Sequence, residues 1–268
     1  LEVELVGRVQ LASAGESGEV TVPARKLVDI CKSLPEGSDI QFSMQESKVT
    51  VKSGRSRFTL STLSAREFPN VEDSMGTHQF TLKQGELKRL IERTGFAMAQ
   101  QDVRYYLNGM LWELNDKQLR VVATDGHRLA MCTLPHKVGV EGDTQVILPR
   151  KGVLELSRLL LDEEAEIVIV IGSNHIRATT NDFTFTSKLV DGKFPDYQRV
   201  LPRNPDKMVL GSRLELRQAF TRTAILSNEK YRGVRVSLSP GLMELQAHNP
   251  EQEEAEEKLE VEYQGDEL

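Results

Sequence analysis

One short run, residues 124–128 with the sequence Thr-Asp-Gly-His-Arg, holds the residue types most able to do chemistry. Asp125 could orient the imidazole of His127, and such a pair can move a proton in acid–base catalysis. The alternative is a turn between two strands, in which an Asp side chain accepts hydrogen bonds from the backbone. The turn is favoured, because the related stretch 247–249 keeps Ala and an Asx residue but is followed by acidic residues. We therefore predict no catalytic residue here.

Other kinds of reactive site find little support in the sequence. The five His and two Cys residues show no metal-ligand spacing, and no G-x-x-x-x-G-K-[ST] loop occurs that would predict nucleotide hydrolysis. Trp112, in the strand-like stretch 110–114, is predicted to be a core residue and not a stacking platform for bases. We expect no metal and no cofactor. A metal-dependent nuclease or phosphotransferase, which would need carboxylates converging on a divalent cation, stays open as the alternative function.

The composition is typical of a soluble globular protein, with 39% hydrophobic and 28% charged residues. The longest strongly apolar run, residues 167–171, is far too short to span a bilayer, so no membrane partner is expected. No signal-peptide pattern opens the chain. Cys31 and Cys132 lie on apolar stretches, which predicts buried, reduced thiols in a cytoplasmic protein.

The distribution of charge matters more than its total. A net charge of −6 would argue against a nucleic-acid binder if it were spread evenly. Four predicted amphipathic helices, at 24–34, 84–95, 150–160 and 212–223, instead sum to +7, which leaves −13 on the rest of the chain. These cations could form one shared surface that attracts a polyanion without reading its sequence, with weak, salt-sensitive binding. The alternative is that each helix simply has an ordinary solvated outer face.

The four helices belong to an internal repeat of about 125 residues. Residues 22–26 correspond to 148–152, and residues 123–125 correspond to 247–249. Each unit reads as helix, strands, helix, strands, with the alternating apolar pattern of half-buried antiparallel strands. This order predicts an α+β fold of repeated domains. The expected domains are the C-terminal part of a first copy at 1–77, a complete second copy at 78–206 and the N-terminal part of a third copy at 207–268.

Four longer strings carry a family resemblance. Residues 101–109, 124–129, 194–202 and 225–233 resemble the beta subunit of bacterial DNA polymerase III, the DNA sliding clamp. The resemblance implies a processivity factor that encircles duplex DNA and tethers the replicative polymerase without catalysis. It also implies three similar domains per protomer and a homodimeric ring, with helices lining the hole on the inner face and sheets on the outer face. Relative to that pattern, the chain lacks the start of the first domain and the end of the third.

The resemblance also implies two binding sites. One is a groove where the polymerase, clamp loader subunits and other clamp-binding proteins dock a short linear motif. Its matching positions are Arg104, Tyr106, Leu107, Thr124, Gly126, His127, Leu129, Pro195, Arg199 and Val200. The other is contact with double-stranded DNA, carried onto Arg25, Gln101, Tyr105 and Tyr106, with Arg150 and Lys151 as further basic candidates.

Closure of the ring is the third implied site. Phe58 and Leu60, on an edge strand, would meet Ile225 and Leu226 of the other protomer and extend a sheet. Opposite charges would then face each other across the interface. The basic side is Lys26, Lys48, Arg55 and Arg57, and the acidic side is Glu251, Glu253, Glu254 and Glu257. The alternative for the acidic run is a solvated loop.

Overall fold

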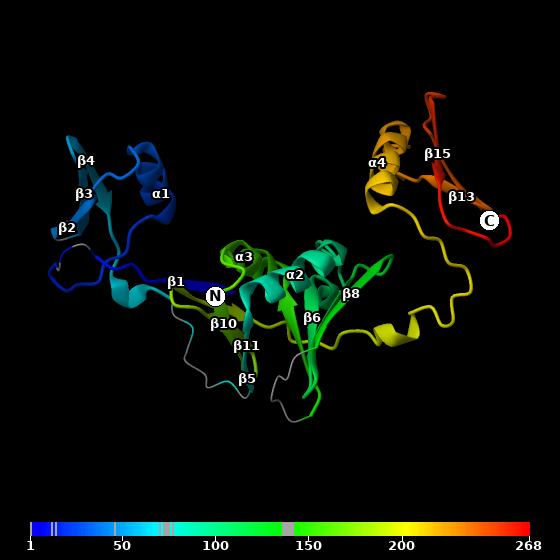
Figure 1. The fold of residues 1–268 in the computed structure, drawn as a ribbon. Helices are drawn as coiled ribbons and strands as arrows, with labels where there is room; N and C mark the ends of the chain where they lie inside the picture. Colours follow the sequence, from blue (N-terminus) through cyan, green and yellow to red (C-terminus); the bar gives the residue numbers. More distant parts are fainter. Residues whose placement is uncertain are drawn as a thin grey trace. The chain divides into compact units, whose positions relative to one another are not determined.

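The computed structural model describes residues 2–11, 13, 15–45, 47–69, 71, 76, 78–135 and 142–268. Figure 1 shows its elements along the chain. The four helices are α1 (Ala24–Ser33), α2 (Gln84–Thr94), α3 (Arg150–Leu159) and α4 (Arg213–Thr223). Each lies where the sequence predicts a helix, because an apolar stripe at helical spacing is long enough to fix the element. Within the described residues, no helix is long and apolar enough to cross a membrane.

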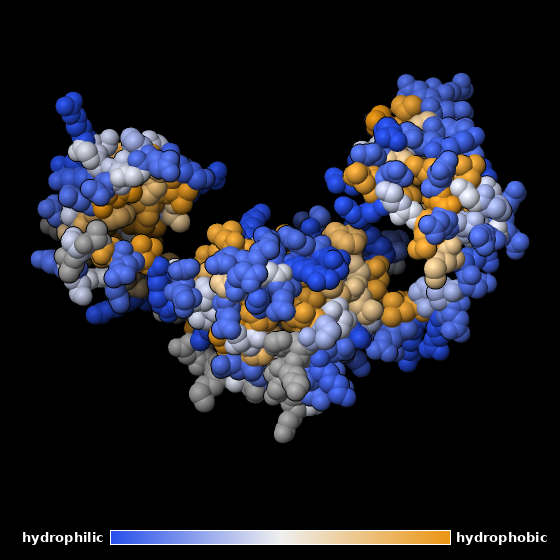
Figure 2. Space-filling model, viewed as in Figure 1, coloured by the Kyte–Doolittle hydropathy of each residue, from blue (hydrophilic) through white to orange (hydrophobic). Residues whose placement is uncertain are grey.

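The N-terminal module pairs one helix with one small sheet. Strands β2 (Gln41–Gln45), β3 (Lys48–Ser53) and β4 (Ser56–Ser61) form an antiparallel sheet in the order β2-β3-β4. Its core consists of three buried residues, Val49, Val51 and Leu60, with half-buried neighbours on α1 and the flanking segments. No residue of α1 is fully buried. Figure 2 shows hydrophobic residues at the surface of this module among hydrophilic ones.

The central domain places two helices against two antiparallel sheets that share one core. The first sheet has the order β1-β12-β11-β10-β5 and the second the order β8-β7-β6-β9. The first contains β1 (Val3–Gly7), β12 (Phe183–Lys188), β11 (His175–Thr179), β10 (Glu166–Ile171) and β5 (His78–Lys83). The second contains β8 (Leu129–Pro135), β7 (Gln118–Thr124), β6 (Gly109–Leu114) and β9 (Thr144–Pro149). Helices α2 and α3 pack against each other and against these sheets.

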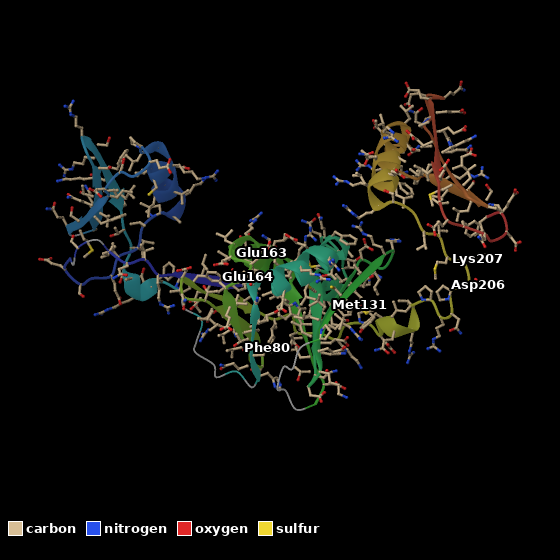
Figure 3. All side chains as sticks on the ribbon, in the orientation of Figure 1. Phe80, Met131, Glu163, Glu164, Asp206 and Lys207 are labelled. Carbon is tan, nitrogen blue, oxygen red and sulfur yellow. The ribbon has the colours of Figure 1, made fainter. Side chains whose placement is uncertain are left out.

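The two halves of the central domain exchange strands. Strand β5 precedes α2 but pairs with β10 in the later half, and β9 precedes α3 but pairs with β6 in the earlier half. The start of α2 also touches the loop after α3, since the Gly85 N–H donates to the Glu163 carbonyl at 3.0 Å. Lys83 Nζ lies 2.6 Å from a carboxylate oxygen of Glu164 in the same loop (Figure 3). The halves are therefore interlocked at the strands and at the helix ends.

Residues 196–268 form a separate compact unit. Helix α4 packs on an antiparallel sheet of β13 (Arg235–Ser239), β14 (Leu242–His248) and β15 (Glu254–Glu260). The buried core is Ala219, Met243, Leu245, Val261 and Tyr263. The segment before α4, where Asp206 and Lys207 form a salt bridge at 3.6 Å (Figure 3), leads to Leu210, which bridges to Glu262.

Short 3-10 helices complete the chain. They are η1 (Ala65–Glu67), η2 (Gly95–Ala97), η3 (Tyr105–Leu107), η4 (Tyr197–Arg199) and η5 (Ala224–Leu226). The repeat relation holds at this level too, because η2 follows α2 as η5 follows α4.

Several local predictions can be compared directly with the structure. Trp112 is fully buried, as predicted for a core residue. The expectation of buried thiols is wrong for Cys31, which is exposed because α1 buries none of its residues, and Cys132 is half-buried. Residue 77, at the expected boundary between the first two domains, lies outside the described residues.

Candidate functional site

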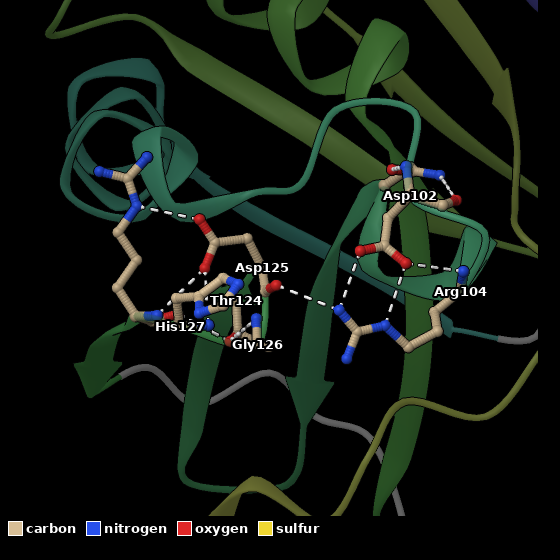
Figure 4. Close-up of polar contacts among 8 residues, drawn as sticks. Asp102, Arg104, Thr124, Asp125, Gly126 and His127 are labelled. Carbon is tan, nitrogen blue, oxygen red and sulfur yellow. Dashed lines mark hydrogen bonds and ion pairs between the residues drawn. The ribbon is translucent and has the colours of Figure 1, made fainter. Parts of the chain in front are cut away.

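A dense polar cluster lies at the loop between η2 and η3 of the central domain (Figure 4). The Asp102 carboxylate accepts three hydrogen bonds from Arg104, from its backbone N–H at 2.8 Å, from Nε at 3.0 Å and from Nη2 at 2.9 Å. The side-chain hydrogen bond from Arg104 is the largest cause that lowers the pKa of Asp102 to about 2, and it raises the pKa of Arg104. The pair is therefore charged throughout the neutral range.

The run 124–128 is a turn between β7 and β8, as predicted. Asp125 Oδ1 accepts the backbone N–H groups of His127 and Arg128, both at 3.0 Å. The His127 N–H is the largest cause that lowers the pKa of Asp125. Because this carboxylate bonds to the backbone of residue 127, the geometry is that of an Asp-stabilised turn. Arg128 Nη2 donates to the Phe96 carbonyl at 2.7 Å, which ties the turn to η2.

Arg104 and Gly126 join the two loops. Arg104 Nη2 donates to the Asp125 carbonyl at 3.3 Å. A Cβ atom at Gly126 would lie 3.0 Å from both terminal nitrogens of Arg104, and Gly126 has φ +88°. Only glycine satisfies that backbone angle without strain and also leaves room for the guanidinium. Thr124 Oγ1 accepts the Gly126 N–H at 3.0 Å and donates to the Arg128 carbonyl at 2.7 Å.

Apolar and aromatic groups border this cluster. Leu107 of η3 is buried, whereas Tyr106 and Leu129 are half-buried and His127 is exposed. A Cβ at Gly192 would lie 3.2 Å from the Tyr105 ring and 3.6 Å from Tyr106 Cβ, so the loop that leads to Pro195 runs beside η3. The structure thus brings most of the predicted groove residues of the central domain to one edge.

Two predicted groove residues belong to the other compact unit. Arg199 and Val200 follow Asp196, where that unit begins, and Arg199 Nε donates to Asp196 Oδ2 at 2.8 Å. Both residues are exposed.

The predicted DNA-contact residues of the central domain also cluster. Gln101 is exposed with φ 58°, a left-handed conformation that is uncommon outside glycine. The rings of Tyr105 and Tyr106 meet edge to face, with centroids 5.7 Å apart. The Arg150 N–H donates to the Asn108 carbonyl at 2.9 Å, which places the start of α3 beside the loop that holds Gln101. Arg25 lies on the exposed part of α1.

Some helix cations are already paired with carboxylates. These pairs are Arg158–Glu155 at 2.9 Å, Lys151–Glu2 at 3.6 Å and Arg222–Glu257 at 2.5 Å. Arg25, Lys32, Arg93 and Arg217 are exposed and form no salt bridge with any residue that the structure describes. Exposed pairs of this kind contribute little to stability in water, so the paired cations are held weakly.

The apolar residues predicted for ring closure lie on strand β4 and in η5. Of the predicted basic residues, Lys26 lies on α1, Lys48 on β3, Arg55 between β3 and β4, and Arg57 on β4. Strand β4 is an edge strand, but Leu60 is buried and Phe58 half-buried against the core of their own module. Ile225 is exposed. Within the acidic run, Glu257 faces α4 and pairs with Arg222, whereas Glu251, Glu253 and Glu254 are exposed.

Asp102 and Asn108 belong to the polar cluster around Arg104, although their residue types and spacing were not predicted to form part of a site. Asn108 accepts the Asp102 N–H at 2.9 Å and donates to the Asp102 carbonyl at 2.8 Å, so it fixes the backbone beneath Arg104. An Asp two residues before an Arg was the available signal, since this spacing suits a side chain that bonds forward to the backbone.

Comparisons with known proteins agree along the whole chain. Three domain families of the DNA polymerase III beta subunit match in order, the N-terminal domain at residues 1–72, the central domain at 81–196 and the C-terminal domain at 198–268. The beta sliding clamp of Pseudomonas aeruginosa is 65% identical over 268 residues, which are 100% of this chain and 73% of that protein. That of Escherichia coli is 56% identical over the same shares.

Solved structures give the same result. A crystal structure of the DNA polymerase III subunit beta from Pseudomonas aeruginosa matches with a TM-score of 0.94 and 65% identity, over 100% of this chain and 73% of that one. A sliding clamp from the same organism bound to griselimycin matches with a TM-score of 0.95 at the same identity and coverage. A griselimycin-bound clamp from Bartonella birtlesii is 37% identical, with a TM-score of 0.91 and the same coverage. The chain, built from repeated domains of helices and antiparallel sheets, therefore belongs to the family of DNA polymerase III beta subunits, the bacterial sliding clamps.

Proposed function

We propose that this chain acts as a DNA polymerase processivity factor that encircles duplex DNA and tethers replication proteins to it, without catalysing a reaction. The observation that carries the proposal is the agreement of all three domain families, in order, with the DNA polymerase III beta subunit. The repeated basic helices of an otherwise acidic chain support it. In this proposal the domains span 1–77, 78–206 and 207–268, and a second protomer in the cytoplasm closes the ring.

The first test concerns binding to DNA. The exposed cations Arg25, Arg93 and Arg217 lie on three of the repeated helices. Changing all three to Gln should weaken binding to duplex DNA of any sequence and should flatten the plot of log affinity against log salt, because fewer counterions are released. Changing Lys117, Lys207 and Lys258 to Gln, exposed cations outside the helices, is the matched control. Equal losses in the two triple variants would contradict a DNA surface on the helices.

The second test concerns enclosure. A clamp should be retained on nicked circular DNA and lost from linear DNA through its ends, whereas a surface binder dissociates equally from both. Gel filtration of the loaded complexes measures the difference, and equal retention would contradict encirclement.

The groove around Arg104, Leu107 and Gly126 is proposed to take short extended peptides. Apolar groups bordered by a few fixed polar ones suit a peptide with apolar anchors. A Pseudomonas aeruginosa clamp 65% identical to this chain is bound to griselimycin in its solved structure, so griselimycin is the probe for this groove. Calorimetric titration should give binding to this chain and a loss of affinity on Leu129→Glu.

The alternative, a metal-dependent nuclease, is separated by incubation of labelled DNA with Mg²⁺. Asp125 is bonded to the backbone of its own turn, which supports a structural role. We expect no turnover. Cleavage abolished by Asp125→Ala or His127→Ala would overturn the clamp proposal.

A further inference from the structure

We propose that Asp102 is a positioning residue of the groove: its carboxylate holds the Arg104 guanidinium against Gly126 before any peptide binds. The inference rests on the proposed peptide-binding function. In this proposal Asp102 does not contact the peptide and acts only through Arg104.

The contacts around Asp102 leave Arg104 little freedom. Asp102 Oδ1 accepts both the backbone N–H and Nε of Arg104, and Oδ2 accepts Nη2. Two parallel bonds between a guanidinium and a carboxylate fix its plane as well as its position. The backbone of Asp102 is itself fixed on both sides by the Asn108 amide. Hydrogen bonds therefore hold each residue in the series from Asn108 through Asp102 to Arg104.

The far end of Arg104 is fixed by the neighbouring turn. Nη2 also reaches the Asp125 carbonyl at 3.3 Å, and both terminal nitrogens face Gly126, where a Cβ would be 3.0 Å away. Among the described residues, no hydrogen bond engages Nη1 of Arg104. A positioned guanidinium with one free nitrogen can donate to a peptide carbonyl or carboxylate without first losing rotamer entropy, which is the general benefit of preorganisation.

The third repeat supplies an internal comparison. The run Asn228-Glu229-Lys230-Tyr231 matches Asp102-Val103-Arg104-Tyr105 at an offset of 126, two residues more than the offset between residues 123–125 and 247–249. Asn228 Oδ1 accepts the backbone N–H of Lys230 at 2.9 Å and that of Tyr231 at 3.0 Å, so an amide is sufficient to build this turn. The carboxylate of Asp102 adds the two side-chain hydrogen bonds that hold the Arg104 guanidinium. The third repeat has neither the Asp nor the Arg, and it has Pro250 where the second has Gly126.

This comparison makes Asp102→Asn a selective variant. The turn should be retained, whereas the paired hydrogen bonds between the Arg104 guanidinium and the Asp102 carboxylate should be lost. The test is calorimetric titration of griselimycin into four proteins: the unsubstituted chain, Asp102→Asn, Arg104→Ala and the double variant. We expect each single change to weaken binding about tenfold, the order expected for a charge-assisted hydrogen bond. The double variant should be no weaker than Arg104→Ala alone, since residues that act as one unit are not additive.

A control and a spectroscopic readout separate positioning from general damage. Asp116→Asn makes the same charge change in an exposed turn at the opposite end of β6 and should leave griselimycin affinity unchanged. The Arg104 Nε–H signal in a ¹H–¹⁵N NMR spectrum should be shifted and protected from exchange in the unsubstituted chain. It should move to the free-arginine position in Asp102→Asn, with the backbone amides of residues 102–108 retained.

The outcomes distinguish this proposal from the proposed function. Additive losses in the double variant, or an unchanged Nε–H signal in Asp102→Asn, would overturn the positioning role while leaving peptide binding intact. Failure of the unsubstituted chain to bind griselimycin would contradict the groove itself, and the NMR comparison would still decide whether Asp102 holds Arg104.

Discussion

At the scale of single residues, the groove edge depends on carboxylates used as anchors and not as acids or bases. Asp102 bonds to Arg104, and Asp125 bonds to backbone N–H groups. Both interactions favour the charged form, which is why the pKa of each carboxyl lies below its ordinary value. An acid–base catalyst would instead require a carboxyl pKa raised toward the operating pH.

The lowered pKa of Asp102 predicts how its pair responds to acid. Since the folded pKa is about 2 and the ordinary Asp pKa is about 3.9, the pair stabilises the fold fully above about pH 4. That contribution is lost as pH falls from about 4 through about 2. Carbon-detected NMR of the Asp102 carboxyl should give a midpoint near 2. A midpoint at the ordinary Asp value would show that the pair does not form in solution.

Gly126→Ala should damage both the turn and Arg104. A non-glycine residue at positive φ costs about 1–3 kcal/mol, and the new methyl group would press on the guanidinium. Gly241→Ala is a matched control, because Gly241 has φ +77° but nothing within 4 Å of its Cβ position. Thermal unfolding should show a loss of stability in both variants, whereas only Gly126→Ala should weaken griselimycin binding. Equal binding by the two variants would contradict a role for the Arg104 contact.

At the scale of elements, helix packing rests on small residues at close contacts. Gly152 of α3 is buried, and a Cβ there would lie 2.6 Å from Ser187 Oγ on β12 and 3.0 Å from a methyl group of Leu148. The matching position of α1 is Lys26, which is exposed. The repeat therefore keeps the helix but not the buried glycine at its contact with the sheet.

Gly152→Ala should destabilise the central domain by about 1–3 kcal/mol, the usual cost of overpacking a core. Gly18→Ala, where nothing lies within 4 Å, controls for the change in chain entropy and should be neutral or slightly stabilising. Urea unfolding followed by Trp112 fluorescence reports on this domain, because the only tryptophan lies in its core. Equal midpoints for the two variants would show that α3 can move away from β12.

Elements were more predictable from sequence than side-chain contacts were. The helix bounds follow from apolar periodicity, which is local, and the repeat supplied each pattern twice. The contact of Arg104 with the Asp125 carbonyl depends on how two loops meet, which no spacing encodes. The pairing of Glu257 with Arg222 was not predicted for the same reason, since the two residues lie on different elements. The exposure of Cys31 depends on what covers α1, which is a property of tertiary packing.

At the scale of the whole molecule, a central domain with two helices and two sheets accompanies two smaller modules, each with one helix and one three-stranded sheet. Phe42 and Met44 of β2 are 55% and 59% exposed. Their counterparts in β10, Ile167 and Ile169, are 0% exposed, since β5 pairs with β10 and both residues share one core cluster with side chains of α2. Among the described residues of the N-terminal module, β2 thus keeps two large apolar side chains exposed.

These exposed side chains predict self-association of the 268-residue chain. Exposed apolar residues on an edge strand such as β2 favour contact with another copy. Sedimentation velocity should show a mass that rises with concentration, and Phe42→Thr with Met44→Thr should suppress the rise. Ser43→Thr, on the same strand between them, is the control. A chain that stays monomeric at every concentration would contradict the prediction.

The strand exchange inside the central domain has a consequence for synthesis. During translation, β5 emerges well before β10 is available to pair with it. One edge of β6 likewise stays unpaired until β9 has been synthesised. Long-range pairing of this kind slows folding and leaves unpaired edges open meanwhile. We expect the domain to gain resistance to protease on stalled ribosomes only after β10 has left the exit tunnel, in one late step. The nascent central domain would therefore depend on holdase chaperones from the time its first half leaves the ribosome until its second half has followed.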